Sequence, residues 1–293
     1  MTLRAQGLLS ALGVLFIWTG FQLFSRLSAA QAFTIWDIAA LRYAGAFLTI
    51  LPIVLLRGLP RIPWRRALAL TLTAGFAFPL AAYAGFQLAP AAHGGVIMAG
   101  LLPFFTAAAW WIGFGERWDW RRAASLALVG LGMLLLAADT FGGHPGAWRG
   151  DLIFLGAVIA WAGYMYLIRK WRIGALDATS AIALCAAPIF LPVWWFLLPS
   201  RLAEIAPGTV LFQMGYHGAI SVVLAGYLFT RAVVLLGGPM TSAVTSGVPV
   251  MVALGAWPLL GETLGWAGWC GIAVVTLGMI TGVSGPAPSA ARA

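Results

Sequence analysis

The chain consists largely of apolar runs of about 20 residues, the length of helix that spans the hydrocarbon core of a bilayer. Short polar stretches separate these runs, so no soluble domain fits between them. Only 9% of the residues are charged, against about 25% in a typical soluble domain. Too little polar surface remains to cover a globule in water. The sequence therefore predicts an all-α protein whose main partner is the lipid bilayer.

Ten membrane spans are expected, and their short loops make neighbouring spans antiparallel hairpins. The spans cover roughly residues 7–27, 35–56, 66–87, 92–114, 121–138, 150–170, 178–198, 209–231, 239–260 and 264–284. The first run resembles a signal peptide, because Arg4 precedes it and Ala30-Gln31-Ala32 resembles a cleavage site. Its length and its similarity to a later run favour a retained helix. Residues 285–293, rich in proline and small residues, are expected to be disordered.

Two internal repeats divide the chain. Residues 103–133 align with residues 249–279 at a shift of 146 without a gap, and 11 of the 31 positions are identical. Residues 7–26 align with residues 150–169 at a shift of 143. Each half of the chain therefore begins with one repeated segment and ends with the other.

The predicted halves are residues 1–146 and 147–284, integrated in one transmembrane domain. Each has five spans, an odd number, so the second half is expected to enter the membrane inverted relative to the first. Inverted repeats of this kind are typical of secondary transporters, whose substrate site lies near mid-membrane between the halves.

The basic residues predict the orientation in the membrane. The net charge of +9 arises from residues in short loops between apolar runs, which indicates orientation rather than nucleic-acid binding. With the N-terminus inside, only Arg26, Arg149 and Arg201 lie outside, and Arg42 lies within a span. All other basic residues are then cytoplasmic, so both termini are expected inside a bacterial inner membrane.

Three features occur once in each half. Trp18-Thr19-Gly20 and Trp161-Ala162-Gly163 lie in the first helices, and Pro103 and Pro249 lie in the fourth helices, which end in Gly-Glu. In this combination the whole chain resembles the EamA branch of the drug/metabolite transporter superfamily. The resemblance implies ten helices, cytoplasmic termini and movement of small metabolites, often export of amino acids and in some members of aromatic ones. An unusual count of 15 tryptophans suggests an aromatic-lined cavity.

Candidate substrate-binding residues are polar or aromatic side chains inside or at the ends of spans, where a lipid-facing polar group is costly. Together they supply donors and acceptors for a zwitterion and aromatic faces for an apolar, aromatic or cationic side chain. Packing or interhelical hydrogen bonding is the alternative for each of them, and hydroxyls can also bond back to their own helix. The candidates are Trp18, Gln22, Tyr83, Gln87, His93, Trp161, Tyr164, His217, Thr241 and Ser242.

Five further residues are interpreted from their positions in the spans and turns. Pro103 and Pro249 are expected to kink their helices, either as static bends or as gating hinges. Glu262, like its repeat mate Glu116, is expected to cap the next helix along the chain. Arg42 is interpreted as an interfacial arginine that snorkels, with binding of a substrate carboxylate as the alternative.

All eight acidic residues map to loops or span ends, so no carboxylate is available to carry protons at the bilayer centre. The sequence thus favours a facilitator that works by alternating access, with a proton-coupled antiporter using His93 or His217 as the alternative. An intramembrane enzyme is a remote alternative, since no nucleophile motif occurs. A channel is a third alternative, but a channel would not require inverted repeats, and no selectivity ring can be read from one chain. The two cysteines and three histidines are scattered, so no metal or other cofactor is expected. The chain is expected to be a monomer or a weak homodimer.

Overall fold

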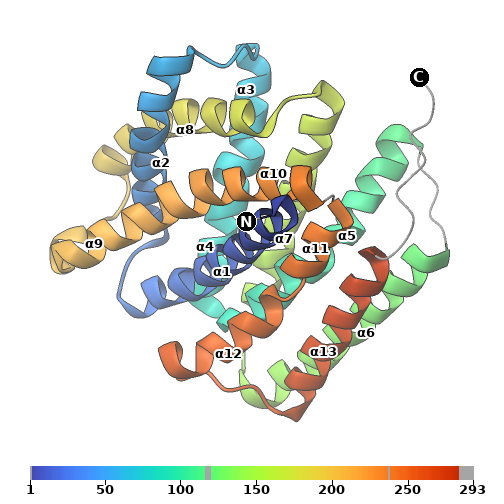
Figure 1. Cartoon of the computed structure of the whole chain (residues 1–293). Coiled ribbons are helices and arrows are strands. Elements are labelled where there is room, and N and C mark those ends of the chain that lie inside the picture. The colour runs from blue at the N-terminus through green and yellow to red at the C-terminus, as the bar shows by residue number, and fades with distance from the viewer. Residues whose placement is uncertain (1, 116–119, 237, 284–293) are drawn as a thin grey trace.

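The computed structural model describes residues 2–115, 120–236 and 238–283, except for some side chains within these ranges. The N-terminal helices are α1 (Leu3–Ala30), α2 (Ile35–Arg57), α3 (Trp64–Leu70), α4 (Phe78–Leu88), α5 (Ala91–Phe114) and α6 (Trp120–Gly143). The C-terminal helices are α7 (Trp148–Trp171), α8 (Ala175–Leu197), α9 (Pro207–Met214), α10 (Ala225–Leu236), α11 (Gly238–Thr245), α12 (Val248–Leu260) and α13 (Trp266–Val283). The described residues contain no β-strand (Figure 1), which confirms the all-α prediction. The predicted tail, residues 285–293, lies outside the described residues.

Within the described residues, seven helices are long and apolar enough to cross a membrane. They are Leu3–Ala30, Ile35–Arg57, Trp64–Leu88, Ala91–Phe114, Trp148–Trp171, Ala175–Leu197 and Pro207–Leu236. The other predicted spans correspond to the shorter apolar helices Ala123–Leu136, Val248–Leu260 and Trp266–Thr281. Large apolar side chains such as Leu56, Trp195 and Val234 are exposed, as expected for surfaces that face lipid.

Two of the long helices contain a π-helical segment at matching places. The helix Trp64–Leu88 contains η1 (Thr71–Ala77), and the helix Pro207–Leu236 contains η3 (Gly215–Leu224). Wider turns of this kind change the direction in which side chains point, and they occur often at functional sites. Neither segment was predicted from the sequence.

Helices α6 and α13 lie side by side at one edge of the molecule (Figure 1). A Cβ on Gly132 would lie 2.7 Å from the carbonyl oxygen of Gly271, and the Ser125 hydroxyl donates to the carbonyl oxygen of Gly278 at 2.6 Å. Gly132, the later of the two α6 residues, thus meets Gly271, the earlier of the two α13 residues. The two helices are therefore antiparallel. Small residues allow this close backbone approach.

The same contact explains why some repeat positions are identical. Val129 and Val275 are repeat mates, and so are Gly132 and Gly278. A Cβ on Gly278 would lie 2.9 Å from a methyl of Val129, and a Cβ on Gly132 would lie 2.6 Å from a methyl of Val275. Val129 on α6 therefore packs against Gly278 on α13, and its repeat mate Val275 packs against Gly132, the repeat mate of Gly278.

Other helix contacts also occur in matched pairs. Helix α1 packs against α10 and α12, and α7, the corresponding helix after residue 146, packs against α4 and α5. Helices α2 and α8, which also correspond, contact each other. The largest buried apolar cluster includes Phe21, Ile38, Phe86 and Phe154, which come from four different helices.

The glycines of the two Gly-Glu pairs end the helices that precede them. Gly115 follows α5 with φ of 68°, and Gly261 follows α12 with φ of 67°. This left-handed conformation suits glycine, which has no Cβ, and it lets the N–H of each glycine bond back to the helix. The left-handed backbone conformation that ends each helix thus explains why both Gly-Glu pairs have a glycine.

The two repeated prolines occupy different settings. The predicted span 239–260 is interrupted, because α11 ends at Thr245 and α12 begins at Val248. Pro249 lies in the first turn of α12, where the absence of an N–H costs no helix hydrogen bond. The backbone of α5 continues through position 103, while the side chain of Pro103 lies outside the described residues.

Candidate functional site

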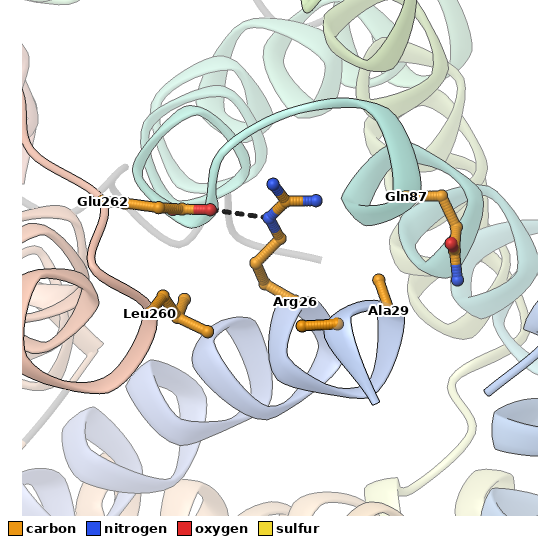
Figure 2. A pocket seen from close by; sticks show the side chains of 6 residues that line it. Arg26, Ala29, Gln87, Leu260 and Glu262 are labelled. Carbon is orange, nitrogen blue, oxygen red and sulfur yellow. Dashed lines mark hydrogen bonds and ion pairs between the residues drawn. The ribbon is translucent and has the colours of Figure 1, made fainter. Parts of the chain in front are cut away.

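A pocket of about 170 Å³ lies where the ends of α1 and α4 meet the segment after α12 (Figure 2). We call it the Arg26–Glu262 pocket. Figure 2 shows the Arg26 and Glu262 side chains pointing toward each other, with Gln87 on the other side of Arg26. Its lining residues are Arg26, Ala29, Ala30, Gln87, Leu260 and Glu262.

Glu262 joins three parts of the chain at this pocket. Its Oε1 accepts a hydrogen bond from Arg26 Nε at 2.6 Å, and its Oε2 accepts one from the N–H of Ala91 at 2.8 Å. Ala91 is the first residue of α5, where a carboxylate is stabilised by unpaired N–H groups and by the helix dipole. The expectation that Glu262 caps the next helix is therefore wrong, because it caps α5. Its repeat mate Glu116 lies outside the described residues.

Replacing this carboxylate should destabilise the protein. In Glu262→Gln, one oxygen remains to serve either Arg26 or Ala91, so one of the two interactions is lost. We expect a loss of about 1–2 kcal/mol, as for a helix cap or a hydrogen bond to a charged group. Thermal unfolding in detergent would show it as a lower midpoint.

The matched control is Glu204→Gln. Arg201 and Glu204 form a second pair at 2.6 Å, but both side chains are more than half exposed. Solvent screening makes such a pair weak, so its unfolding midpoint should stay at the wild-type value. Equal shifts for Glu262→Gln and Glu204→Gln would contradict a capping role for Glu262.

A second group of side chains is buried among α1, α2, α4 and η3. Arg42 Nη1 donates to the carbonyl oxygen of His217 at 3.3 Å, and the Tyr83 hydroxyl lies 3.1 Å from His217 Nδ1. The guanidinium carbon of Arg42 lies 5.7 Å from the centre of the Phe21 ring, a distance typical of cation–π contacts. We call Phe21, Arg42, Tyr83 and His217 the Arg42–His217 cluster.

The cluster depends on close contact between α2 and η3. A Cβ on Gly218 would lie 2.5 Å from Cα of Gly45, so the two backbones touch. Gly218 follows His217, and Gly45 lies three residues after Arg42. Because Gly45 and Gly218 have no side chains, α2 and η3 approach closely where they cross, and His217 comes to lie against Arg42.

Arg42 differs from its sequence interpretation. Its side chain is turned into the protein and is only 9% exposed, so the snorkelling interpretation is wrong. Nearby Asp37 is engaged elsewhere, since it caps α2 and accepts hydrogen bonds from Trp194 Nε1 and from the N–H of Arg201. Among the described residues, no carboxylate forms an ion pair with Arg42.

The predicted site residues do not form one group. Tyr83 and His217 belong to the Arg42–His217 cluster, while Gln87 lines the Arg26–Glu262 pocket and donates to the carbonyl oxygen of Phe33 at 3.2 Å. His93 is fully buried, and its Nδ1 lies 3.1 Å from a carboxylate oxygen of Asp151.

The two repeated tryptophans occupy corresponding helix contacts. The Trp18 ring lies 5.4 Å from that of Phe229, where α1 meets α10. The Trp161 ring lies 4.7 Å from that of Phe78, where α7 meets α4, and 5.0 Å from that of Tyr164. These ring contacts do not distinguish between the two alternatives given for the tryptophans, cavity lining and packing.

The remaining candidates are Gln22, Thr241 and Ser242. Gln22 is buried, and its Oε1 has no hydrogen-bond partner. Thr241 is fully buried, and its carbonyl oxygen accepts a bond from the Thr245 hydroxyl at 3.1 Å, one turn along the same helix. The side chain of Ser242 lies outside the described residues.

Sequence reasoning missed the roles of Phe21, Asp151 and Glu262, and misplaced the side chain of Arg42. Only Arg42 had a usable signal, because it is the one basic residue well inside a predicted span. Within the described part of the chain, no three His, Cys, Asp or Glu side chains gather as metal ligands would.

Comparison with known proteins identifies the family. The model of the EamA-like transporter family matches residues 5–138 and again residues 148–282. An uncharacterized transporter of Bacillus subtilis (strain 168), YwfM, is 31% identical over 201 residues, which make up 64% of this chain and 63% of that protein. The match thus spans less than two thirds of that relative.

One known crystal structure also has a similar fold. It superimposes with a TM-score of 0.66 and 19% identity, over 95% of this chain and 96% of the other. This likeness shows a shared fold, while the two family matches cover most of the chain and indicate a transporter rather than an enzyme. The chain belongs to the EamA-like transporter family and is an integral membrane protein.

Proposed function

We propose that this transporter exports amino acids with aromatic or other apolar side chains across a bacterial inner membrane. It works by alternating access between two inverted five-helix repeats, residues 1–146 and 147–284, with both termini in the cytoplasm. The excess of basic residues in the loops assigned to the cytoplasm supports this orientation.

The packing of α6 and α13 supports an inverted arrangement. These helices end the two proposed repeats, and they run antiparallel with matched contacts at Val129, Gly132, Val275 and Gly278. A two-fold axis perpendicular to both helices relates such a pair. For helices that span a bilayer, that axis lies in the membrane plane, as in inverted-repeat transporters.

The observation that carries the proposal is the Arg42–His217 cluster. Phe21, Arg42 and Tyr83 come from the first proposed repeat, and His217 comes from the second. Aromatic rings and hydrogen-bonding groups therefore meet inside the protein at the boundary between the repeats. This combination suits a small solute that has both charged groups and an apolar side chain.

The positions of the acidic residues support a facilitator. The described carboxylates of Asp37, Asp151, Asp177, Glu204 and Glu262 lie in first turns of helices or between helices, and that of Asp139 lies near the C-terminal end of α6. None of these six occupies the middle of a span. The pair of buried His93 and half-buried Asp151 is the observation that favours the second candidate, a proton-coupled antiporter.

Transport by the purified protein in proteoliposomes tests the proposal. We expect radiolabelled phenylalanine, tryptophan and leucine to equilibrate across the membrane without a pH gradient, and faster than in protein-free liposomes. Uptake that strictly requires the gradient would replace the facilitator by the antiporter. If no amino acid is transported under either condition, the proposed substrate class is wrong.

A further inference from the structure

We infer that the Arg42–His217 cluster binds the carboxylate of the transported solute. This inference rests on the proposed function and deepens it, because it assigns one chemical group of the substrate to named side chains. The required substrate class is a small molecule with a free carboxylate and an apolar or aromatic remainder.

The first argument is the charge of Arg42. An arginine stays protonated in a protein, and a buried charge without an opposite charge is costly. The described neighbours of the guanidinium are the carbonyl oxygen of His217, the ring of Phe21 and the hydroxyl of Tyr83, none of which is a carboxylate. A substrate carboxylate would supply the missing charge.

Geometry also favours a carboxylate as the ligand. The guanidinium has five N–H donors in a planar fork that matches the two oxygens of a carboxylate. One of these donors, at Nη1, bonds to the carbonyl oxygen of His217, and the guanidinium also has a hydrogen bond with the hydroxyl of Tyr83. The remaining donors are suited to a bidentate bond.

The second argument is the imidazole of His217. The side chain is fully buried, and its Nε2 has no hydrogen-bond partner. Its Nδ1 faces the Tyr83 hydroxyl. When Tyr83 donates to Nδ1, the proton of the neutral ring resides on Nε2, which then donates to a carboxylate oxygen. A buried polar atom without a partner is rare in folded proteins, and a ligand that binds there would satisfy it.

Gln213 provides an acceptor for the other end of an amino acid. It lies four residues before His217, is fully buried, and its Oε1 also has no partner. Its Nε2 donates to Oε1 of Gln31 at 3.4 Å, which orients the amide. The free oxygen can therefore accept a hydrogen bond from a substrate ammonium group. The carboxylate would meet the charged guanidinium of Arg42, whereas the ammonium would meet only a neutral amide oxygen. The carboxylate is therefore the primary requirement for binding, and the ammonium is a secondary one.

Ligand binding to the purified protein tests the inference. Isothermal titration calorimetry in detergent would compare L-phenylalanine, phenylacetate, which lacks the ammonium, and L-phenylalaninamide, which lacks the carboxylate. Wild-type protein should bind both carboxylates and bind the amide at least about tenfold more weakly, the loss expected when charged groups are left unpaired. This comparison requires no variant. Equal binding of the amide, or no binding of either carboxylate, would overturn the inference.

Variants assign the effect to Arg42. Arg42→Gln should raise the Kd of both carboxylates at least about tenfold, and Arg42→Lys should raise it less, because a lysine keeps the charge without the fork. Arg231→Gln is the control, since Arg231 pairs with Gln6 outside the cluster and its loss should leave the Kd unchanged. A folded Arg42→Gln protein with the wild-type Kd would overturn the inference.

The outcomes separate this inference from the proposed function. Arg42-dependent binding of phenylacetate without transport of any amino acid would support the carboxylate site and refute amino-acid export. Transport of amino acids combined with equal affinity for L-phenylalanine and its amide would support export and refute the carboxylate site.

Discussion

Gly218→Ala should destabilise the protein by about 3 kcal/mol, the upper end of the usual range for overpacking. A Cβ at this position would lie 2.5 Å from Cα of Gly45 and 2.6 Å from the backbone nitrogen of Ala46. These neighbours are backbone atoms, which cannot move aside as the end of a flexible side chain can. Helix α2 and segment η3 would have to separate, and His217 would move away from Arg42. Both the unfolding midpoint and ligand binding should therefore decrease.

Gly215→Ala is the matched control in the same π-helical segment. A Cβ on Gly215 would meet no other atom within 4 Å, so the methyl group has room. Alanine restricts the unfolded chain more than glycine does, so we expect unchanged stability or a gain of about 0.5–1 kcal/mol. Thermal unfolding of both variants in detergent, with the yield of monodisperse protein, measures the difference. Similar losses for the two variants would show that the loss in Gly218→Ala does not come from the α2–η3 contact.

Much of the architecture could be predicted because its determinants are local. The length and polarity of each apolar run predict a helix without knowledge of its neighbours. Of the residues that are identical in the segments 103–133 and 249–279, Val129, Gly132, Val275 and Gly278 lie where α6 and α13 touch. Boundaries were less accurate, since α6 continues to Gly143 and the helix that includes α10 continues to Leu236.

The candidate site could be predicted only in part, because it depends on contacts between distant segments. Tyr83 and His217 were selected as polar residues within spans, but nothing local indicates that they meet. Their meeting requires the glycine contact between α2 and η3, together with the π-helical turn, which has no sequence signature. Glu262 was assigned to the helix that follows it, because the sequence does not show that the N-terminus of α5 lies beside it.

The repeated tryptophans lead from this architecture to the transport cycle. In an inverted-repeat transporter, each half adopts the arrangement of the other half as the protein changes conformation. Trp18 at the α1–α10 contact and Trp161 at the α4–α7 contact would then exchange environments. In this structure the Trp161 ring lies 4.7 Å from that of Phe78 on α4, and the Trp18 ring lies 5.4 Å from that of Phe229 on α10. Trp161 therefore makes the closer aromatic contact with the other half in this conformation, and Trp18 would make the closer contact in the opposite one.

Trp161→Ala and Trp18→Ala should both impair transport without abolishing expression, and they should shift the conformational equilibrium in opposite directions. An aromatic pair contributes about 0.5–1.5 kcal/mol, which corresponds to an approximately two- to tenfold change in the ratio of conformations. For a facilitator, such a change raises the half-saturation concentration at one membrane face and lowers it at the other.

Uptake into right-side-out and inside-out membrane vesicles measures the half-saturation concentration at each face. The ratio of the two values should move one way in Trp161→Ala and the other way in Trp18→Ala. The double variant should return toward the wild-type ratio, because the two losses oppose each other, although its maximal rate stays low. Shifts in the same direction for both single variants would mean that the tryptophans do not exchange environments. Full activity in both would show that transport depends neither on substrate contact by these tryptophans nor on their packing at the interface.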